Sequence, residues 1–181
     1  PEEIQAGWQR IVDLMARILS VPAALIMRID PPGIEVFLSS ATAENPYRKG
    51  QCADLTTRLY CKKVMEQKAS LLVHDALKEP EWGHNPANKL GMTFCIGYPL
   101  TWPDGENFGT ICILDRKDNP QATQFRALVS EFQQVIEKDL QLLFVIRERD
   151  ELLADSKRYG NHPQEVISKK AIALDERKKM S

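Results

Sequence analysis

The sequence has no uninterrupted apolar stretch near the roughly 18–20 residues that a membrane-spanning helix needs. Its longest candidate, residues 21–29, is broken by Pro22 and Arg28. A signal-peptide pattern is also missing. The first residue is Pro1 rather than Met, so we expect a fragment or a processed chain without a membrane segment.

An excess of charge of either sign is missing as well. The chain of 181 residues carries 24 Lys and Arg against 25 Asp and Glu, a formal net charge of −1. Nucleic-acid and membrane-surface binding usually require a basic excess, so we expect neither partner. With 43% hydrophobic residues, the chain can build a core, and its length suits one domain with an appendage.

The four cysteines form no metal-binding pattern. Cys52, Cys61, Cys95 and Cys112 include no pair at CxxC spacing, and no histidine stands at zinc-finger spacing from them. Hence no metal site is predicted. Three of them lie in apolar or mixed runs, where free cysteine behaves as a small buried hydrophobe. Free thiols fit a reducing compartment, and we expect a cytoplasmic protein.

Periodicity predicts helices and strands in the first half of the chain. Apolar residues recur every three to four positions over residues 2–20, which indicates an amphipathic helix ended by Pro22. A turn at residues 31–33 joins two predicted strands into a hairpin. Asp54 is the candidate cap of the next helix. The expected segments are strands at 23–30 and 34–40, a loop at 41–53, a helix at 55–68, a strand at 70–75 and an irregular stretch with one or two helical turns at 76–92.

A second hairpin is predicted around Pro103, Asp104 and Gly105. Proline fixes φ and glycine accepts a positive φ, so this triplet suits a turn. The flanking segments, 93–100 and 107–114, alternate and are rich in β-branched and aromatic residues. Both faces of this hairpin are apolar, and a sheet that is apolar on both sides must be covered on both sides.

The cover follows Asn119 and Pro120, where 37 residues contain no proline or glycine. The apolar spacing alternates near four and three, and Asp139 and Asp150 occupy two positions of the seam. A helix of this length spans roughly 55 Å, so its second half, from about residue 147, is expected to leave the domain. Such a stripe usually pairs with a partner helix in a coiled coil. The alternative is a solvated tail stabilised by Glu/Arg pairs.

These elements predict an α+β fold with an antiparallel sheet of five to six strands. The terminal helices cover one face, and crossing loops with short helices cover the other. The expected domain spans residues 1–157, including the long helix. Residues 158–181 are expected to be a linker or the start of a following segment.

The order of elements and three stretches resemble a GAF domain. The stretches are "SLLVHDALKEPEW", "NPANKLGMTFCIGYPL" and "GENFGTICILDRKDN", and the resemblance covers about residues 7–153. The sequence is similar to GAF modules of bacterial signalling proteins, such as histidine kinases of two-component systems and diguanylate cyclases. The sequence contains neither a glycine-rich nucleotide loop nor a GGDEF motif. The resemblance therefore implies the sensor part, with an output domain elsewhere in the full-length chain and a homodimer formed through the N- and C-terminal helices.

The resemblance also implies a ligand cavity between the sheet and the crossing segment. Aromatic surface and a few polar groups on loops held by a rigid sheet suit such a site. Two members have simpler alternatives: Trp82 as a packed lid on the core, and His84 as a turn residue. The candidate lining is Phe37, Tyr60, Trp82, His84, Asn85, Leu90, Met92, Cys95, Tyr98 and Cys112.

No cofactor is predicted from these residues. Asn88 and Lys89 match the start of the cyclic-nucleotide signature, but the Phe and Asp-Glu that should follow are missing. None of the cysteines precedes a histidine, so no covalent chromophore is expected. Haem would need an axial ligand, and nothing singles out His74 or His84 for it. The ligand remains unknown.

An enzyme built on the same fold is the alternative function. A free methionine-R-sulfoxide reductase needs a cysteine of low pKa and a second, resolving cysteine. Cys95 and Cys112 lie on the two arms of the second hairpin and are the candidates. Phe94 and Ile96 make an apolar setting that raises a thiol pKa. We therefore expect a non-catalytic regulatory sensor rather than an enzyme.

Overall fold

The computed structural model describes residues 2–159 and contains a six-stranded antiparallel sheet. The strand order is β3-β2-β1-β6-β5-β4, so β1 and β6 lie at the centre. The strands are β1 (Ala23–Asp30), β2 (Gly33–Ser39), β3 (Cys52–Asp54), β4 (Leu71–Val73), β5 (Phe94–Thr101) and β6 (Asn107–Asp115). The helices are α1 (Glu2–Ile18), α2 (Tyr60–Gln67), η1 (Pro80–Trp82), η2 (Pro86–Leu90), α3 (Pro120–Gln124) and α4 (Arg126–Tyr159).

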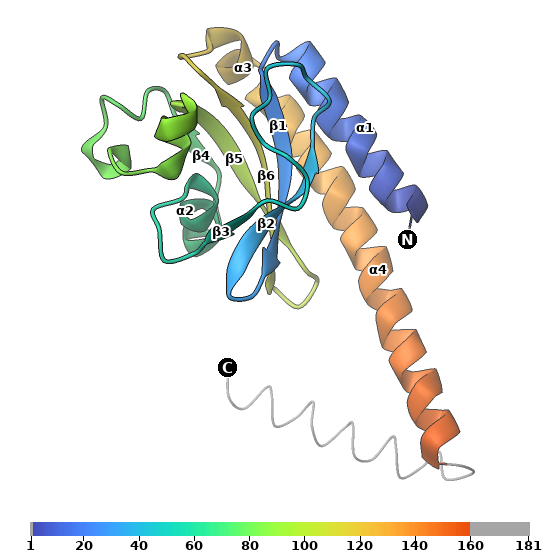
Figure 1. The fold of residues 1–181 in the computed structure, drawn as a ribbon. Coiled ribbons are helices and arrows are strands. Elements are labelled where there is room, and N and C mark those ends of the chain that lie inside the picture. The colour runs from blue at the N-terminus through green and yellow to red at the C-terminus, as the bar shows by residue number, and fades with distance from the viewer. Residues whose placement is uncertain (1, 160–181) are drawn as a thin grey trace. The chain divides into compact units, whose positions relative to one another are not determined.

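Two layers of different kinds cover the sheet. Helix α1 and the first part of α4 lie along one face, whereas α2 and the segment that carries η1 and η2 lie against the other (Figure 1). This arrangement confirms the predicted α+β architecture, with six strands.

The central hairpin contributes side chains to both layers by alternation. Gly97 pairs with Cys112 and Ile96 with Ile113 in the β5–β6 register. Cys112 belongs to the core cluster under α2. Ile96 and Ile113 are fully buried outside that cluster, as expected for the face under the terminal helices, since alternate residues of a strand point to opposite sides. The prediction that both faces of this hairpin need a cover is confirmed.

Polar contacts fix the terminal helices to each other and to the sheet. The indole Nε1 of Trp8 donates to Oδ2 of Asp139 at 2.8 Å, which joins α1 to α4. The backbone N–H and the hydroxyl of Thr101 donate to Oε1 of Glu137 at 3.0 and 2.9 Å. The side-chain amide of Gln133 donates to the carbonyl of Pro99 at 2.7 Å. Asp139 stands at a position of the α4 stripe where an apolar residue was expected. Its carboxylate accepts a hydrogen bond there from the buried indole of Trp8.

Two segment boundaries differ from the sequence prediction around Asp54. Residues 52 and 53, predicted as loop, and Asp54, predicted as a helix cap, form the edge strand β3. Helix α2 begins at Tyr60, not at residue 55. The carboxylate of Asp54 accepts from the backbone N–H of Thr56 at 2.7 Å, so it forms a local turn instead of a helix cap.

The long helix also differs from its prediction, because it is interrupted near its start. Asn119 caps α3, accepting from the N–H of Ala122 at 2.9 Å. Phe125 then separates α3 from α4 with φ −98° and ψ 17°. In the part that follows, Val129, Ile136 and Leu140 are fully buried.

The chain divides into two compact units, one ending at Leu140 and the other beginning at Gln141. In the second unit, residues 141–159 are helical and expose Leu142, Val145, Leu152 and Leu153. Most of the predicted linker at 158–181 lies outside the described residues. None of the helices within residues 2–159 combines the length and apolarity required to cross a bilayer.

We predict that Gly109→Ala destabilises the domain by at least about 3 kcal/mol, because overpacking against backbone leaves no room to relax. A Cβ at this position would lie 1.8 Å from the carbonyl oxygen of Met27 on the neighbouring strand. Urea unfolding followed by circular dichroism measures the change.

Gly7→Ala is the matched control for this substitution. The nearest atom to a Cβ at Gly7 is 3.8 Å away, and alanine is favoured over glycine in a helix by about 0.5–1 kcal/mol. We expect a small gain in stability. Equal effects of the two substitutions would contradict the proposed close approach of β6 to β1.

Candidate functional site

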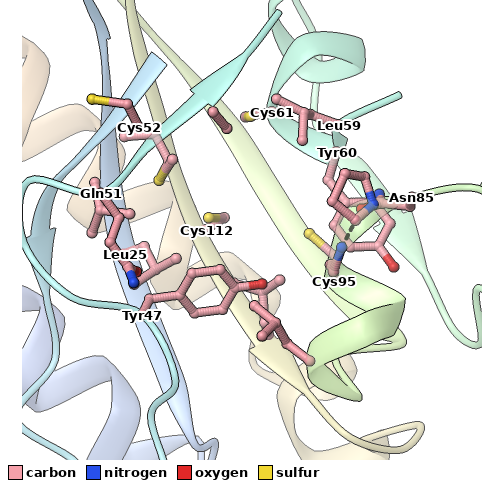
Figure 2. A pocket seen from close by; sticks show the side chains of 17 residues that line it. Leu25, Tyr47, Gln51, Cys52, Leu59, Tyr60, Cys61, Asn85, Cys95 and Cys112 are labelled. Atoms are coloured by element: carbon pink, nitrogen blue, oxygen red, sulfur yellow. Dashed lines mark hydrogen bonds between the residues drawn. The ribbon is translucent and has the colours of Figure 1, made fainter. Parts of the chain in front are cut away.

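A cavity of about 370 Å³ lies between the sheet and the segments that cover it on the α2 side. Its volume falls in the range of small-molecule sites, about 300–1,000 Å³. Strands β1, β2 and β6 supply its floor, and the start of α2, η2 and the 47–53 segment supply its walls (Figure 2). The lining residues are Leu25, Met27, Val36, Tyr47, Gln51, Cys52, Ala53, Leu59, Tyr60, Cys61, Asn85, Pro86, Ala87, Leu90, Cys95, Cys112 and Leu114.

Aliphatic and sulfur-containing side chains make up most of this wall. The polar groups with strong hydrogen-bonding capacity come from Tyr47, Gln51, Tyr60 and Asn85. Among the 17 described residues that line the cavity, none is Asp, Glu, Lys, Arg or His. The cavity therefore offers apolar surface with a few neutral hydrogen-bonding groups.

Asn85 is the lining residue that has a buried side-chain atom without a hydrogen-bond partner. It is 3% exposed, and its Oδ1 accepts from the backbone N–H of Ala87 at 2.8 Å, which caps η2. Its Nδ2 has no hydrogen-bond partner. A buried polar atom without a partner costs free energy, on the order of 1–3 kcal/mol. The amide donor is thus available to a molecule in the cavity.

Two tyrosines bring phenol groups to the cavity from different sides. The hydroxyl of Tyr60 donates to the carbonyl of Met92 at 3.2 Å, and Tyr47 reaches inward from the 47–53 segment (Figure 2). Burial, which disfavours the phenolate, raises the pKa of both tyrosines well above its usual range. Both phenols are therefore neutral at physiological pH.

All four cysteines line the cavity, and three of them are buried thiols. Burial raises the pKa of Cys61 to about 12 and the pKa of Cys95 and Cys112 well above the usual range. Cys52 is exposed. Desolvation disfavours a thiolate, so the buried thiols remain protonated near neutral pH.

The strand register does not favour a disulfide between Cys95 and Cys112. Cys95 pairs with Leu114, and Cys112 pairs with Gly97, so the two cysteines are diagonal neighbours. Diagonal positions lie about 7–8 Å apart, beyond the usual Cα–Cα range of about 4.4–6.8 Å for a disulfide. Both are free in the structure.

Five of the ten residues predicted from the sequence to line the cavity do so. They come from α2, η2 and the central hairpin, which the sheet brings together although they are distant along the chain. They are Tyr60, Asn85, Leu90, Cys95 and Cys112.

Trp82 and Met92 lie behind the cavity wall. The ring of Trp82 packs on Tyr60 with a centroid separation of 5.0 Å, and Met92 is fully buried in the same core cluster. Neither lines the cavity. They support the wall from outside, and the alternative reading of Trp82 as a packed side chain agrees with this position.

Phe37, Tyr98 and His84 lie elsewhere. Phe37 follows a register shift in the β1–β2 pairing and packs edge-on against Trp8 of α1 at 6.2 Å. The hydroxyl of Tyr98 donates to the carbonyl of Arg126 at 3.4 Å, on the α4 side. His84 is exposed. The structure thus places two of the predicted aromatics, Phe37 and Tyr98, toward the terminal helices, because strand alternation puts them on the face opposite the lining residues Val36 and Cys95.

Sequence reasoning missed the wall contributed by Tyr47, Gln51 and Cys52. The segment was expected to be loop, yet β3 pairs with β2, and the N–H of Val36 donates to the carbonyl of Gln51 at 2.8 Å. The available signal was an aromatic side chain, Tyr47, inside a polar Pro- and Gly-bearing stretch.

A group of possible metal ligands stands at the edge of the sheet. Atoms of Asp30, Glu35 and Cys52 lie within 4.8 Å of one another, the one such group of three among the described residues. Arg28 already donates to Glu35 through Nε at 2.8 Å. That ion pair balances the charge of Glu35.

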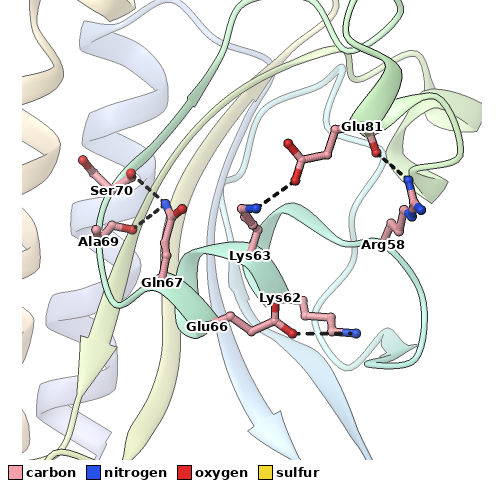
Figure 3. Close-up of polar contacts among 8 residues, drawn as sticks. All are labelled: Arg58, Lys62, Lys63, Glu66, Gln67, Ala69, Ser70 and Glu81. Atoms are coloured by element: carbon pink, nitrogen blue, oxygen red, sulfur yellow. Dashed lines mark hydrogen bonds and ion pairs between the residues drawn. The ribbon is translucent and has the colours of Figure 1, made fainter.

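Ion pairs on the outer side of α2 hold the crossing segment in place. Lys63 contacts the carboxylate of Glu81 at 2.9 Å, and Arg58 donates to the carbonyl of Glu81 at 3.3 Å (Figure 3). Lys62 and Glu66 form an (i, i+4) pair at 3.9 Å. Exposed pairs of this kind contribute little each, about 0–1 kcal/mol. The contacts of Lys63 and Arg58 with Glu81 nevertheless connect α2 and the segment before it to η1, next to Trp82.

Solved structures with the same fold include both regulatory domains and enzymes. The GAF domain of an Acinetobacter phosphoenolpyruvate-protein phosphotransferase superposes with a TM-score of 0.62 at 9% identity, covering 80% of this chain and 86% of that one. A free methionine-R-sulfoxide reductase from Neisseria meningitidis, solved with its substrate, has a TM-score of 0.62 at 13% identity, covering 76% and 78%.

A third similar structure is the blue-light-absorbing form of the PixJ GAF domain from Thermosynechococcus elongatus. Its TM-score is 0.59 at 16% identity, with 88% of this chain and 96% of that one covered. At these identities the likeness concerns the fold. None of the curated proteins matches the chain by sequence.

The family assignment rests on a longer match. The family model for the GAF domain matches residues 3–140, which span α1, the whole sheet and the part of α4 that packs in the first unit. The chain therefore belongs to the GAF domain family.

Proposed function

We propose that this GAF domain is a non-catalytic regulatory sensor that binds a small molecule in the cavity. The observation that carries the proposal is a neutral, mostly apolar cavity lined by Asn85, whose buried Nδ2 has no hydrogen-bond partner. A purely structural core would leave that atom unsatisfied without benefit. A ligand with an acceptor atom would complete its hydrogen bonding.

The second candidate is a methionine sulfoxide reductase, because two similar structures are free methionine-R-sulfoxide reductases. Such an enzyme needs a thiolate nucleophile. The pKa of Cys61 is about 12, and burial holds the pKa of Cys95 and Cys112 above the usual range. No lining residue in the described chain carries a charge to lower them. The chemistry of the wall favours the sensor.

The sensor is proposed to act as a homodimer through its terminal helices. In the first unit, Leu14 and Ile18 on α1 and Val135 on α4 are 39%, 41% and 46% exposed. In the second, Leu142 and Val145 stand seven and ten residues after Val135 and are exposed. Apolar residues at such intervals are typical of a helix that pairs with another helix.

The signal is proposed to pass through these helices to an output domain in the same full-length, cytoplasmic chain. Strands β1 and β6 carry cavity residues such as Leu25 and Cys112 on one face. Their alternate residues, such as Ile26 and Ile111, are fully buried outside the α2-side core cluster. A ligand that shifts the central strands would therefore change how α1 and α4 pack against the sheet. Packed helices tend to hold discrete arrangements, so such a change can act as a switch.

Filling the cavity is the first test. We expect Ala53→Phe to abolish ligand binding, because Ala53 lines the cavity from β3 and a phenyl ring would occupy its space. Native mass spectrometry of the purified chain measures the bound fraction as the mass difference between native and denatured samples. Ala41→Phe, at an exposed loop position, should keep the bound molecule. Undiminished binding in Ala53→Phe would locate the ligand outside the cavity.

The reductase alternative predicts turnover, and the sensor predicts none. We expect no methionine to form from free methionine-R-sulfoxide and dithiothreitol. In the native chain at pH 7.5, a disulfide reagent should modify about one thiol within minutes, because Cys52 is exposed and a pKa of about 12 leaves on the order of one Cys61 thiol in ten thousand ionised. Cys52→Ser should remove this reaction. Steady turnover that Cys95→Ser abolishes would establish the enzyme instead.

Dimer formation is the third test. We expect Val135→Lys to raise the dimer dissociation constant at least about tenfold, because a charge would enter an apolar helix contact. Sedimentation equilibrium measures it. Gln134→Lys, at the exposed neighbouring position, is the control and should leave the constant nearly unchanged. A chain that is monomeric at high micromolar concentration would refute the helical pairing.

A further inference from the structure

The cavity has no side chain that could neutralise a charged ligand. Its 17 described lining residues are uncharged, and its tyrosines and buried cysteines keep their protons at physiological pH because burial raises their pKa. A carboxylate, phosphate or ammonium group placed here would lose its hydration without gaining a counter-ion. That penalty outweighs the contacts a small ligand can make.

The N-terminus of α2 is a part of the wall that attracts partial negative charge. Tyr60 begins the helix, and no side chain caps it. The partial charge of a helix end, about half an elementary charge, suits an acceptor dipole better than a full anion.

Asn85 specifies what the ligand must offer. Its Oδ1 is held by the N–H of Ala87 at 2.8 Å, which fixes the orientation of the amide. The remaining Nδ2 is a donor that the described protein leaves without a partner. A carbonyl oxygen or an unprotonated ring nitrogen would satisfy it.

We propose that the ligand is an uncharged, largely apolar molecule that presents one hydrogen-bond acceptor to Nδ2 of Asn85. This inference rests on the proposed function and adds the ligand's chemical class. It excludes nucleotides, which carry phosphate, and free amino acids, which are zwitterions. It selects flat carbonyl or heteroaromatic compounds of a size that a cavity of about 370 Å³ can enclose.

Three matched probes test the two parts of the inference. 2-Acetylnaphthalene has an acceptor, 2-ethylnaphthalene has nearly the same shape without one, and 2-naphthoate has a charge. Dissociation constants are measured by NMR titration of the full chain. We expect 2-acetylnaphthalene to bind about tenfold more tightly than 2-ethylnaphthalene, the ratio that one hydrogen bond to a buried amide supports. We expect 2-naphthoate to bind at least about 100-fold more weakly than 2-acetylnaphthalene.

Asn85→Ser isolates the amide donor. Serine also caps helices, so it can keep the contact with the N–H of Ala87 while it removes Nδ2. The tenfold preference for 2-acetylnaphthalene should disappear, and 2-ethylnaphthalene should bind as before. Asn119→Ser is the matched control, because Asn119 caps α3 through the same kind of bond to Ala122 and does not line the cavity. It should keep the preference.

The outcomes separate the inference from the proposed function. Tight binding of 2-naphthoate, or an unchanged preference in Asn85→Ser, would overturn the inference and leave a ligand-binding sensor. Failure of all three probes to bind would also overturn it, and a molecule co-purified with the chain would then support the proposed function alone. If the probes bind equally well to Ala53→Phe, their site is not the cavity and the inference fails, whereas the proposed function fails only if the co-purified molecule also stays bound in Ala53→Phe.

Discussion

The structure depends on a sheet whose two central strands are apolar on both faces. Strand β6 is buried almost along its whole length, and β1 is buried over residues 23–27, so water must be excluded from each side. The terminal helices do this by close packing, with Trp8, Val12 and Met15 of α1 buried. The α2 side is covered by a short helix, two 3₁₀ turns and a loop segment, which pack less completely and leave the cavity. The need to exclude water from both faces of the sheet therefore produces a closely packed face under α1 and α4 and a face with a cavity under α2.

The cavity on the α2 side is uncharged, because the described segments that cover it direct no charged side chain into its lining. Charged side chains of α2 and η1, such as Lys63 and Glu81, form ion pairs with each other on the outer surface, where water screens them. The inner side receives aliphatic groups, protonated thiols and phenols. This division follows from the cost of burying an unpaired charge. Among the lining residues, Asn85 is the one with a buried side-chain atom, Nδ2, that has no partner in the described chain.

Much of the fold could be predicted because it rests on periodicity. The predicted strand at 23–30 coincides with β1, and the hairpin around Gly105 forms as expected. Local hydrogen bonding could not be predicted in the same way. The carboxylate of Asp54 accepts from the N–H of Thr56 in a turn, and α2 begins at Tyr60 instead of residue 55. For the cavity, the residues on regular elements next to the hairpin were predictable. Phe37 was placed wrongly, because it alternates with Val36, which lines the cavity, and so lies on the helix face. Tyr47 was missed because its segment becomes a wall only after β3 pairs with β2.

The same alternation that builds two layers also couples them. Leu25 and Cys112 form a neighbouring pair on the cavity face, and Ile26 and Ile111 form the next pair on the helix face. Since a well-packed core transmits displacement instead of absorbing it, a ligand that spreads the first pair must disturb the second. The response reaches helices that are joined by the Trp8–Asp139 hydrogen bond and held to β5 through Glu137. In the proposed sensor, these contacts make α1 and α4 move together with the sheet, and occupancy of the cavity changes the position of the two helices.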